Sequence, residues 1–190
     1  SSKEMNFLSK DLLIHVTSFF RDAEVFKYLA ASIIPEMVAA HPAGQPLRVW
    51  VPACSSGEEV YALAMLFLKE IAAAKKSIKL QVFGSDIDEQ AVATARAGIY
   101  PASIADDIAP DLLSHFFAAE NDSYRILPAL RENVIFTTQD VLSDPPFARM
   151  DLVSCRNLLI YLLPEAQHRL LGLLHFALRS NGVLLLGSAE

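Results

Sequence analysis

The sequence predicts an α/β fold in which helices cover both faces of a parallel sheet. Short apolar runs typical of buried strands alternate with segments whose apolar residues recur with the period of a helix. Strands that alternate with helices pair in parallel, because each helix returns the chain to the same end of the sheet. The length of 190 residues, with 53% hydrophobic and 20% charged residues, suits one globular domain with a sizeable core.

Residues 6–42 are predicted to form N-terminal helices, with a break around residues 17–22. The second helix would place four apolar residues on one face, namely Val25, Leu29, Ile33 and Met37. A proline and a glycine follow His41 and would end this helix, because neither residue favours its continuation.

Four predicted elements in the order β-α-β-α come next. They are a strand at residues 47–51, a helix at 58–72, a strand at 79–85 and a helix at 88–97. Asp88 is suited to cap the start of the second helix, and Gly98 is suited to end it.

Residues 99–132 break the alternation and are predicted to form an inserted subdomain. It would contain a helical piece at 111–118 and a hairpin near 124–130. The alternation resumes with strands at 134–138 and 151–155, a helix at 164–179 and a strand at 183–186. A Rossmann-like core would therefore comprise residues 46–98 and 133–190, with five parallel strands.

Charge and cysteine content limit the classes of partner and compartment. Lys and Arg number 16 against 22 Asp and Glu, so the net charge is -6 and nucleic-acid binding is not expected. The sequence shows no signal peptide or long apolar segment, so we expect a cytoplasmic protein without membrane insertion. Cys54 and Cys155 are expected to be reduced thiols; the alternative is a disulfide, because each lies at the end of a predicted strand.

A turn of small residues at 53–57 joins a predicted strand to a helix that begins with Glu58 and Glu59. Small residues let a ligand approach the backbone, and Asp86 at the next strand end can accept hydrogen bonds from both ribose hydroxyls. The turn lacks the G-x-G-x-x-G pattern, and two carboxylates would repel a pyrophosphate. They suit instead the amino group of S-adenosylmethionine, a phosphate-free cationic ligand. The alternative is that the pair only caps the helix, as one of the two is expected to do.

Four segments in chain order carry a resemblance to a known family. They are Thr17-Ser18-Phe19-Phe20-Arg21, Cys54-Ser55-Ser56-Gly57-Glu58-Glu59, Asp86-Ile87-Asp88 and Cys155-Arg156-Asn157-Leu158-Leu159-Ile160-Tyr161. From residue 12 to residue 190 the chain resembles the CheR family of chemotaxis-receptor glutamate methyltransferases. The resemblance implies methyl transfer from S-adenosylmethionine to glutamate side chains on receptor signalling helices. The products would be a glutamate methyl ester and S-adenosylhomocysteine.

The resemblance also implies a role for each matching residue. Arg21 and Tyr161 would be catalytic residues, and no metal is implied. The cofactor would contact Thr17, Arg21, Ala53, Glu59, Asp86, Asp140, Val141, Arg156 and Asn157. Within this set Glu59 would bind the amino group of the cofactor, Asp86 its ribose and Asp140 its adenine amino group.

The implied chemistry needs no general base. A glutamate carboxylate, with a reference pKa of about 4.3, is already ionised near neutral pH. The enzyme must align the carboxylate oxygen with the methyl carbon and the sulfonium, and it must exclude water. We expect Arg21 to clamp the carboxylate and Tyr161 to hydrogen-bond to the same group or shape the methyl pocket. Outside this context, an arginine is more often solvated and a tyrosine more often part of the core.

Four positions depart from the usual pattern of the family. His15 and Asp140 stand where asparagine is frequent, Ala53 stands where glycine is frequent, and Val60 stands where proline is frequent at a helix start, a change that we expect to be mild. We expect Asp140 to keep its role, because a carboxylate also accepts a hydrogen bond from an amino group. We expect Ala53 to be tolerated if its φ is negative.

The resemblance implies regions that this sequence does not contain. Family members usually carry a helical domain before the Thr17 segment and further strands after Glu190, so we expect the C-terminal strands of the sheet to be missing. The chain would then be a module of a larger protein, with sensory or methylesterase domains as possible fusion partners. Residues 99–132 correspond to a small β-subdomain with which some relatives dock a receptor peptide, and their short length argues against docking here.

Two other functions fit the same residues. One is a catalytically silent module that binds S-adenosylmethionine or its product and signals to a neighbouring domain. The other is a methyltransferase for a small molecule, which an enclosed apolar pocket would favour. Intact Arg21 and Tyr161 favour catalysis over the silent module.

Overall fold

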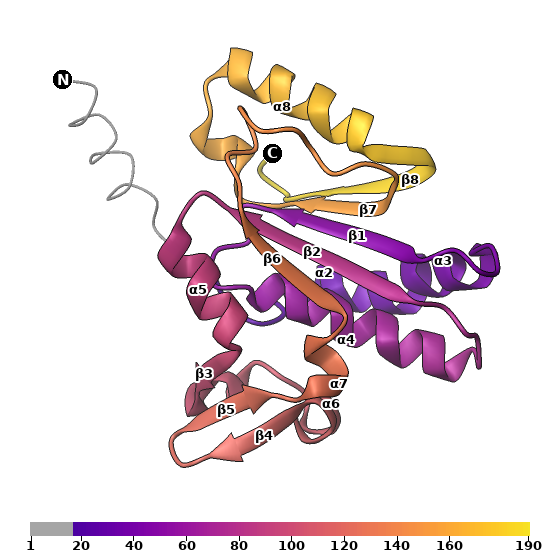
Figure 1. Cartoon of the computed structure of the whole chain (residues 1–190), viewed down its shortest axis with the longest axis vertical. Coiled ribbons are helices and arrows are strands. Elements are labelled where there is room, and N and C mark those ends of the chain that lie inside the picture. The colour runs from indigo at the N-terminus through magenta and orange to yellow at the C-terminus, as the bar shows by residue number, and fades with distance from the viewer. Residues whose placement is uncertain (1–16) are drawn as a thin grey trace.

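The computed structural model describes residues 17–190, which form a central parallel sheet, helices on both of its faces and a small second sheet (Figure 1). The five central strands lie in the order β6-β2-β1-β7-β8, and every neighbouring pair is parallel. Their bounds are Leu47–Pro52 for β1, Leu80–Asp86 for β2, Val134–Thr138 for β6, Met150–Cys155 for β7 and Leu178–Leu186 for β8. The predicted fold class is confirmed.

The strand order reverses direction between β1 and β7. From β1 the chain moves outward through β2 to β6, and it then returns to the other side of β1 to form β7 and β8. Open parallel sheets bind ligands beyond the carboxyl ends of their strands at such a reversal. The topology therefore locates the candidate site before any side chain is considered.

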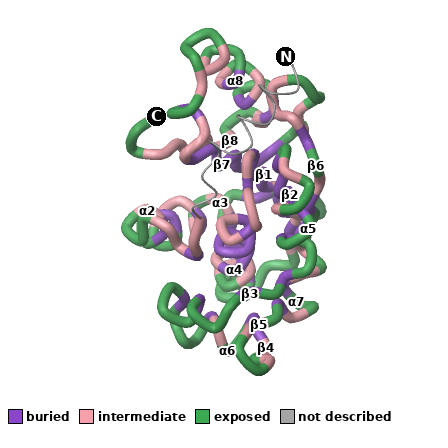
Figure 2. The backbone as a smooth tube through the Cα atoms, turned by 90° about the vertical axis from the view of Figure 1, so that its left-hand side faces the viewer, coloured by how far each residue is buried: buried purple, intermediate pink, exposed green. Residues whose placement is uncertain are grey.

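Helices cover the two faces of the sheet unequally. On one face lie α2 (Ala23–Tyr28), η1 (Leu29–Ile33), α3 (Ile34–Ala40), α4 (Glu58–Ala73) and α5 (Glu89–Ala97); on the other lies α8 (Pro164–Ala177). Side chains alternate along β1, so that Val49 and Val51 pack in the core that contains α4, and Trp50 packs in the core that contains α8. Figure 2 shows that the buried residues follow β1, β2, β7 and α4.

The N-terminal helices differ from the prediction in their register. The first predicted helix and His15 lie outside the described residues. The second contains a π-helical turn, η1, which lengthens the interval between the buried residues Leu29 and Ile34. The predicted residues Val25, Ile33 and Met37 are partly buried and pack against the core, beside the buried Phe26 and Val38.

The capping signals of α5 are confirmed. Asp88 Oδ1 accepts hydrogen bonds from the backbone amides of Gln90 at 2.8 Å and Ala91 at 3.3 Å. Gly98 ends the helix with a φ of 61°, in the left-handed region that glycine adopts at low cost. Local sequence therefore determines both ends of this helix.

The inserted subdomain is a three-stranded antiparallel sheet with short helices. Its strands, in the order β3-β5-β4, are Ile99–Pro101, Ser123–Ile126 and Phe117–Glu120; its helices are η2 (Ala102–Asp106), α6 (Pro110–Phe116) and α7 (Pro128–Arg131). The predicted helix end and hairpin position were wrong. Phe117 leaves the helix and pairs with Ile126 instead, because this pairing buries both side chains.

The last strand is longer and less regular than predicted. Leu178 pairs with Met150 and Val183 pairs with Leu152, so the chain between these two pairs bulges at Asn181, whose φ is 67°. Among the described strands, β8 is an edge strand that pairs with β7 alone. Within residues 17–190, no helix is long and apolar enough to cross a membrane.

Candidate active site

A cavity of about 240 Å³ opens at the carboxyl ends of the central strands. It is lined by the loops that follow β1, β2, β6 and β7 and by the segment that precedes α2. Every residue predicted for the site lines it: Thr17, Arg21, Ala53, Glu59, Asp86, Asp140, Val141, Arg156, Asn157 and Tyr161. The structure thus brings all of them together, and their individual contacts to a ligand stay predictions.

The segment that precedes α2 is anchored beside the sheet by an aromatic side chain. Phe19 is 2% exposed and packs edge-to-face on Tyr100 and Phe117, with ring centroids 5.0 and 5.7 Å apart. This burial is typical of a core residue. The anchor places Thr17 and Arg21 at the cavity wall.

The turn between β1 and α4 has a strained backbone. The φ of Ala53 is 53° and that of Ser55 is 49°, so the negative φ on which the tolerance of Ala53 depended is not present. The chain must turn sharply from the strand end into the helix, and a left-handed residue at this point provides the change of direction. Gly57 has a φ of 92°, and a Cβ there would lie 2.8 Å from the Cβ of Ala95.

Asp86 supports this turn from the end of β2. Its Oδ2 accepts a hydrogen bond from the Ser55 amide at 2.7 Å, and its Oδ1 accepts one from the Asp88 amide at 2.9 Å. The residue is only 5% exposed, yet it lines the cavity. Each carboxylate oxygen has a second lone pair, so Asp86 can still accept hydrogen bonds from two ribose hydroxyls.

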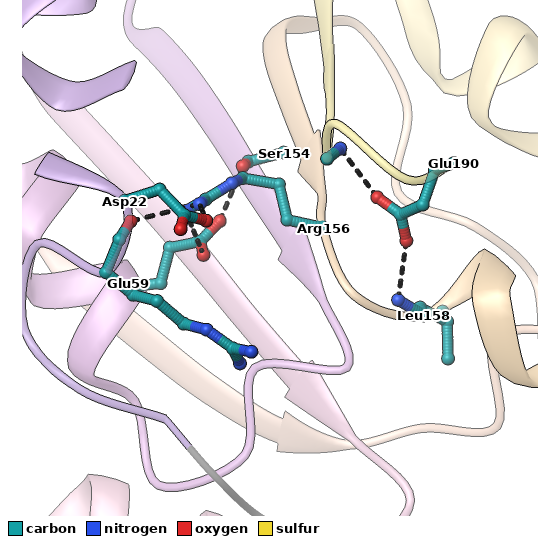
Figure 3. Close-up of polar contacts among 8 residues, drawn as sticks. Asp22, Glu59, Ser154, Arg156, Leu158 and Glu190 are labelled. Carbon is teal, nitrogen blue, oxygen red and sulfur yellow. Dashed lines mark hydrogen bonds and ion pairs between the residues drawn. The ribbon is translucent and has the colours of Figure 1, made fainter. Parts of the chain in front are cut away.

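Glu59 and Arg156, which both line the cavity, form a largely buried ion pair (Figure 3). Glu59 Oε2 accepts a hydrogen bond from Arg156 Nη1 at 3.0 Å, and Glu59 Oε1 accepts one from the hydroxyl of Ser154 at 2.5 Å. Arg156 Nη2 also donates to the Arg21 carbonyl oxygen at 3.0 Å and pairs with Asp22. Arg156 therefore joins the N-terminal segment to the sheet, in addition to lining the cavity.

The two glutamates at the start of α4 have different surroundings. Burial raises the pKa of Glu59, and the neighbouring Arg156 and Ser154 partly offset this rise. Glu58 does not line the cavity; it accepts hydrogen bonds from the Ser56 hydroxyl at 2.9 and 2.8 Å, and burial raises its pKa too. The N-cap of the helix is Gly57, which makes no side-chain capping bond. The interpretation that both glutamates only cap the helix is therefore wrong for Glu59.

The loop after β6 forms another wall of the cavity. Asp140 Oδ1 accepts a hydrogen bond from the Leu142 amide at 3.0 Å, and its Oδ2 accepts one from the Ser143 hydroxyl at 2.9 Å. Sequence reasoning missed Gln139, whose side-chain Oε1 is buried without a hydrogen-bond partner in the described part of the chain. An oxygen in this state can accept a hydrogen bond from a ligand amino group.

The Asn157–Tyr161 segment is held by a residue that sequence reasoning also missed. Glu190 Oε1 accepts hydrogen bonds from the amides of Leu158 at 2.7 Å and Leu159 at 3.0 Å, and its Oε2 accepts one from Gly187 at 2.6 Å. The carboxylate thus caps the short helix η3 (Leu159–Tyr161). Tyr161 is 55% exposed at the cavity wall, so it is not a core tyrosine.

The charges around the cavity fit a cationic ligand without phosphate. Three acidic residues line it, namely Glu59, Asp86 and Asp140, together with two arginines. One of the arginines, Arg156, is already paired with carboxylates, so no cluster of cations remains to bind a pyrophosphate. Among residues 17–190, no group of His, Cys, Asp or Glu side chains could hold a metal ion, and Cys54 and Cys155 are buried free thiols.

Comparisons with known proteins agree with this chemistry. The family described as CheR methyltransferase, SAM binding domain, matches residues 15–190. A Rhodobacter capsulatus protein named "Uncharacterized 104.1 kDa protein in hypE 3'region" is 44% identical over 187 residues, which cover 98% of this chain and 20% of that protein. Chemotaxis protein methyltransferase 1 of Pseudomonas aeruginosa is 32% identical over 179 residues, which cover 92% of this chain and 65% of the relative.

The chain is shorter than these relatives. It spans 66% of the chemotaxis protein methyltransferase of Listeria monocytogenes, to which it is 31% identical over 179 residues. Among solved structures, a SAM-dependent methyltransferase from Geobacter sulfurreducens in complex with S-adenosyl-L-homocysteine matches 91% of this chain and 51% of its own, with 16% identity and a TM-score of 0.48. On the family match over most of its length, the chain belongs to the CheR methyltransferase family, of which it forms the S-adenosylmethionine-binding domain.

Proposed function

We propose that this protein transfers a methyl group from S-adenosylmethionine to the carboxylate of a glutamate side chain, as a protein-glutamate O-methyltransferase. The observation that carries the proposal is that Arg21 and Tyr161 line the same cavity as the acidic residues assigned to the cofactor. These two side chains come from opposite ends of the described sequence. An arginine and a tyrosine beside a cofactor cavity suit an anionic acceptor.

The residues divide into cofactor-holding and acceptor-holding groups. We assign the ribose to Asp86, the amino group to Glu59, and the adenine to the loop that contains Asp140 and Val141. The partly exposed side chain of Ile87 adds apolar surface beside the ribose position. This division leaves Arg21 and Tyr161 on the side where an acceptor enters.

The chain's own residues act by placement rather than by proton transfer. In the bound cofactor, a sulfonium supplies the methyl group, and its carbon–sulfur bond breaks as the carboxylate oxygen–carbon bond forms, which leaves S-adenosylhomocysteine. Arg21 orients the acceptor carboxylate through its planar guanidinium. Tyr161 limits water around the nucleophile and donates a hydrogen bond to the acceptor or shapes the methyl pocket. Placement of this kind contributes about 7–11 kcal/mol to rate acceleration in well-oriented reactions.

The proposed acceptors are the signalling helices of chemotaxis receptors, and the proposed compartment is the cytoplasm, where such helices lie. The names of several relatives, each a chemotaxis protein methyltransferase, support this class of acceptor. Another relative is a much larger protein, which supports a fusion of this domain to further domains.

Transfer of a labelled methyl group into a base-labile ester of a receptor cytoplasmic fragment tests the proposal. We expect Arg21→Ala to abolish most transfer, because both charge and orientation are lost. Arg21→Lys should retain part of it, because the charge remains. Tyr161→Phe should reduce transfer less than Arg21→Ala, since the ring keeps its shape. Arg169→Ala, at an exposed position on α8, is the matched control and should leave transfer unchanged.

Measurements of S-adenosylhomocysteine binding and of methyl transfer distinguish the alternative functions. Calorimetric binding of S-adenosylhomocysteine without any methyl transfer to receptor fragments would indicate the silent regulatory module. Label that appears in a small molecule instead of protein would indicate a small-molecule methyltransferase. Full turnover by Arg21→Ala at saturating acceptor would contradict the clamp assignment.

A further inference from the structure

Asp22 was not predicted for the site, yet it pairs with a residue of the cavity wall. Its carboxylate accepts a hydrogen bond from Arg156 Nη2, while Nη1 of the same guanidinium donates to Glu59 at 3.0 Å. The Arg156 side chain is 1% exposed, that of Glu59 is 16% exposed and that of Asp22 is 57% exposed. Figure 3 shows Arg156 between the two carboxylates.

The charges of these three side chains influence how strongly Glu59 attracts a cation, and Glu190 adds a further negative charge near Glu59. If Arg156 faced Glu59 alone, their opposite charges would cancel, and the pair would attract a cation weakly. Asp22 adds a second carboxylate, so two negative charges and one positive charge leave one net negative charge. Glu59 lines the cavity and Asp22 does not, so the surplus charge is available to a ligand at Glu59.

We propose that Asp22 is the counter-ion of Arg156 and thereby leaves the Glu59 carboxylate available to the cationic amino group of the cofactor. Asp22 is a positioning residue in this arrangement, because it acts through Arg156 and does not line the cavity. The inference rests on the proposed orientation of the cofactor, with its amino group at Glu59.

Asp22→Asn removes the charge of the side chain and keeps the backbone conformation. The φ of Asp22 is 63°, a left-handed conformation that asparagine tolerates nearly as well as aspartate does. The asparagine side-chain oxygen can still accept a hydrogen bond from Arg156, so the substitution removes mainly the negative charge. Asp22→Glu restores the charge and is the rescue variant.

Two ligands that differ only at the amino-acid end test the proposal by calorimetry. S-adenosylhomocysteine carries the amino group and the α-carboxylate, and 5′-methylthioadenosine carries the nucleoside and sulfur without either. We expect Asp22→Asn to weaken S-adenosylhomocysteine roughly three- to fivefold, because the ion pair is half exposed, and to leave 5′-methylthioadenosine unchanged. Asp106→Asn, an equal charge change at an exposed position on η2, should alter neither affinity.

Each other outcome overturns a defined part of the argument. Equal weakening of both ligands by Asp22→Asn would assign Asp22 a purely structural role and overturn the proposal. Unchanged S-adenosylhomocysteine affinity in Asp22→Asn, together with a selective loss in Glu59→Gln, would overturn the role of Asp22 but keep the orientation. Failure of Glu59→Gln to weaken S-adenosylhomocysteine selectively would overturn the orientation, and with it the assignment of Glu59 in the proposed function.

Discussion

The two ends of the central sheet both bury charged side chains, but they arrange them differently. At the carboxyl ends, Asp86 and Glu59 are largely buried and still line an open cavity. At the amino ends, Asp151 is 3% exposed and enclosed by protein groups. The Arg48 amide donates to its Oδ2 at 2.8 Å, and the Nε of Arg179 forms an ion pair with its Oδ1 at 2.7 Å.

The two ends of the sheet differ in the groups that neutralise their buried carboxylates. At the amino ends, one cation, Arg179, and one backbone amide, that of Arg48, neutralise the carboxylate, and His41 Nδ1 lies 3.7 Å from its Oδ1. At the carboxyl ends, acidic groups outnumber the available cations, and the cavity leaves room for a cationic ligand. A buried charge needs a partner in either case. The comparison therefore predicts that substitutions at one end change stability and those at the other change ligand affinity.

The largest expected effect is on stability, from Asp151→Ala. This change removes the acceptor of the Arg48 amide and the partner of Arg179, whose side chain is about one third exposed. We expect the free energy of unfolding to fall by about 2–3 kcal/mol, below the full cost of a fully buried pair because Arg179 can reach water. Chemical denaturation measures this loss. The affinity for S-adenosylhomocysteine should stay unchanged at temperatures where the variant is folded, and a parallel loss of affinity would break the comparison.

The next effect is on affinity, from Asp86→Ala. We expect it to weaken S-adenosylhomocysteine more than tenfold, about 1.4 kcal/mol or more, because charge-assisted hydrogen bonds to the ribose are lost. Asp86 also holds the amides of Ser55 and Asp88, so Asp86→Asn is the matched variant that can keep part of this support. Calorimetry on both variants measures the loss, and an unchanged affinity in folded Asp86→Ala would remove Asp86 from the site.

The stability of the protein and its affinity for S-adenosylhomocysteine should change with pH with slopes of opposite sign. Burial raises the pKa of Glu59 above its ordinary value of 4.5. At a pH between the ordinary pKa and the raised pKa, Glu59 is ionised in the unfolded chain but still protonated in the folded protein. The stability of the ligand-free protein should therefore fall as the pH rises through this window. The affinity for S-adenosylhomocysteine should rise over the same window, because its amino group pairs with the ionised carboxylate.

Glutamine substitutions separate these two slopes. Glu59→Gln should remove the contribution of Glu59 to both the stability slope and the affinity slope. Unfolding experiments and calorimetry between pH 4.5 and 7 measure the two slopes. Glu58→Gln is the control, because burial raises the pKa of Glu58 but the residue does not line the cavity. It should change the stability slope and leave the affinity slope intact. An affinity slope that persists in Glu59→Gln would contradict the assignment of the amino group to Glu59.

The smallest expected effect is a gain in stability from Ala53→Gly. Ala53 has a φ of 53°, which costs a residue with a Cβ roughly 1–2 kcal/mol. Part of this gain is offset because glycine has more freedom in the unfolded chain, so we expect a net stabilisation of roughly 0.5–1 kcal/mol. Thermal unfolding measures the gain, and a destabilised variant would show that the methyl group contributes packing that outweighs the strain.

Sequence reasoning predicted the core elements well and the details of contact poorly. Hydrophobic periodicity placed β6 without error and the other core helices and strands close to their observed bounds, because each depends on its own side chains. The exception is β8, which begins at Leu178 and not at Val183. The π-helical turn at η1 was missed, since a local change of helix type depends on packing against the sheet. The strand that starts at Phe117 was missed for the same reason, because its partner lies elsewhere in the chain.

In the candidate site too, sequence reasoning identified the residues that belong to local motifs but missed the residues that support them. The segments that carry the family resemblance all reach one cavity, because each follows a strand or precedes a helix at the same edge of the sheet. The residues that support them, Ser154, Gln139 and Glu190, carry no local signal that separates them from ordinary polar residues. Only their neighbours in space give them a role.

The sequence alone determined the order of the core strands and helices, the acidic character of the turn after β1 and the choice of predicted residues, all of which line the cavity. These properties are local, since periodicity, capping residues and short motifs act within a few positions of the chain. The tertiary structure decided which charges meet. Arg156 reaches Asp22 across 134 positions of sequence and Glu59 across 97. Such pairs depend on the distance and direction between side chains, and these are set only when the elements pack together.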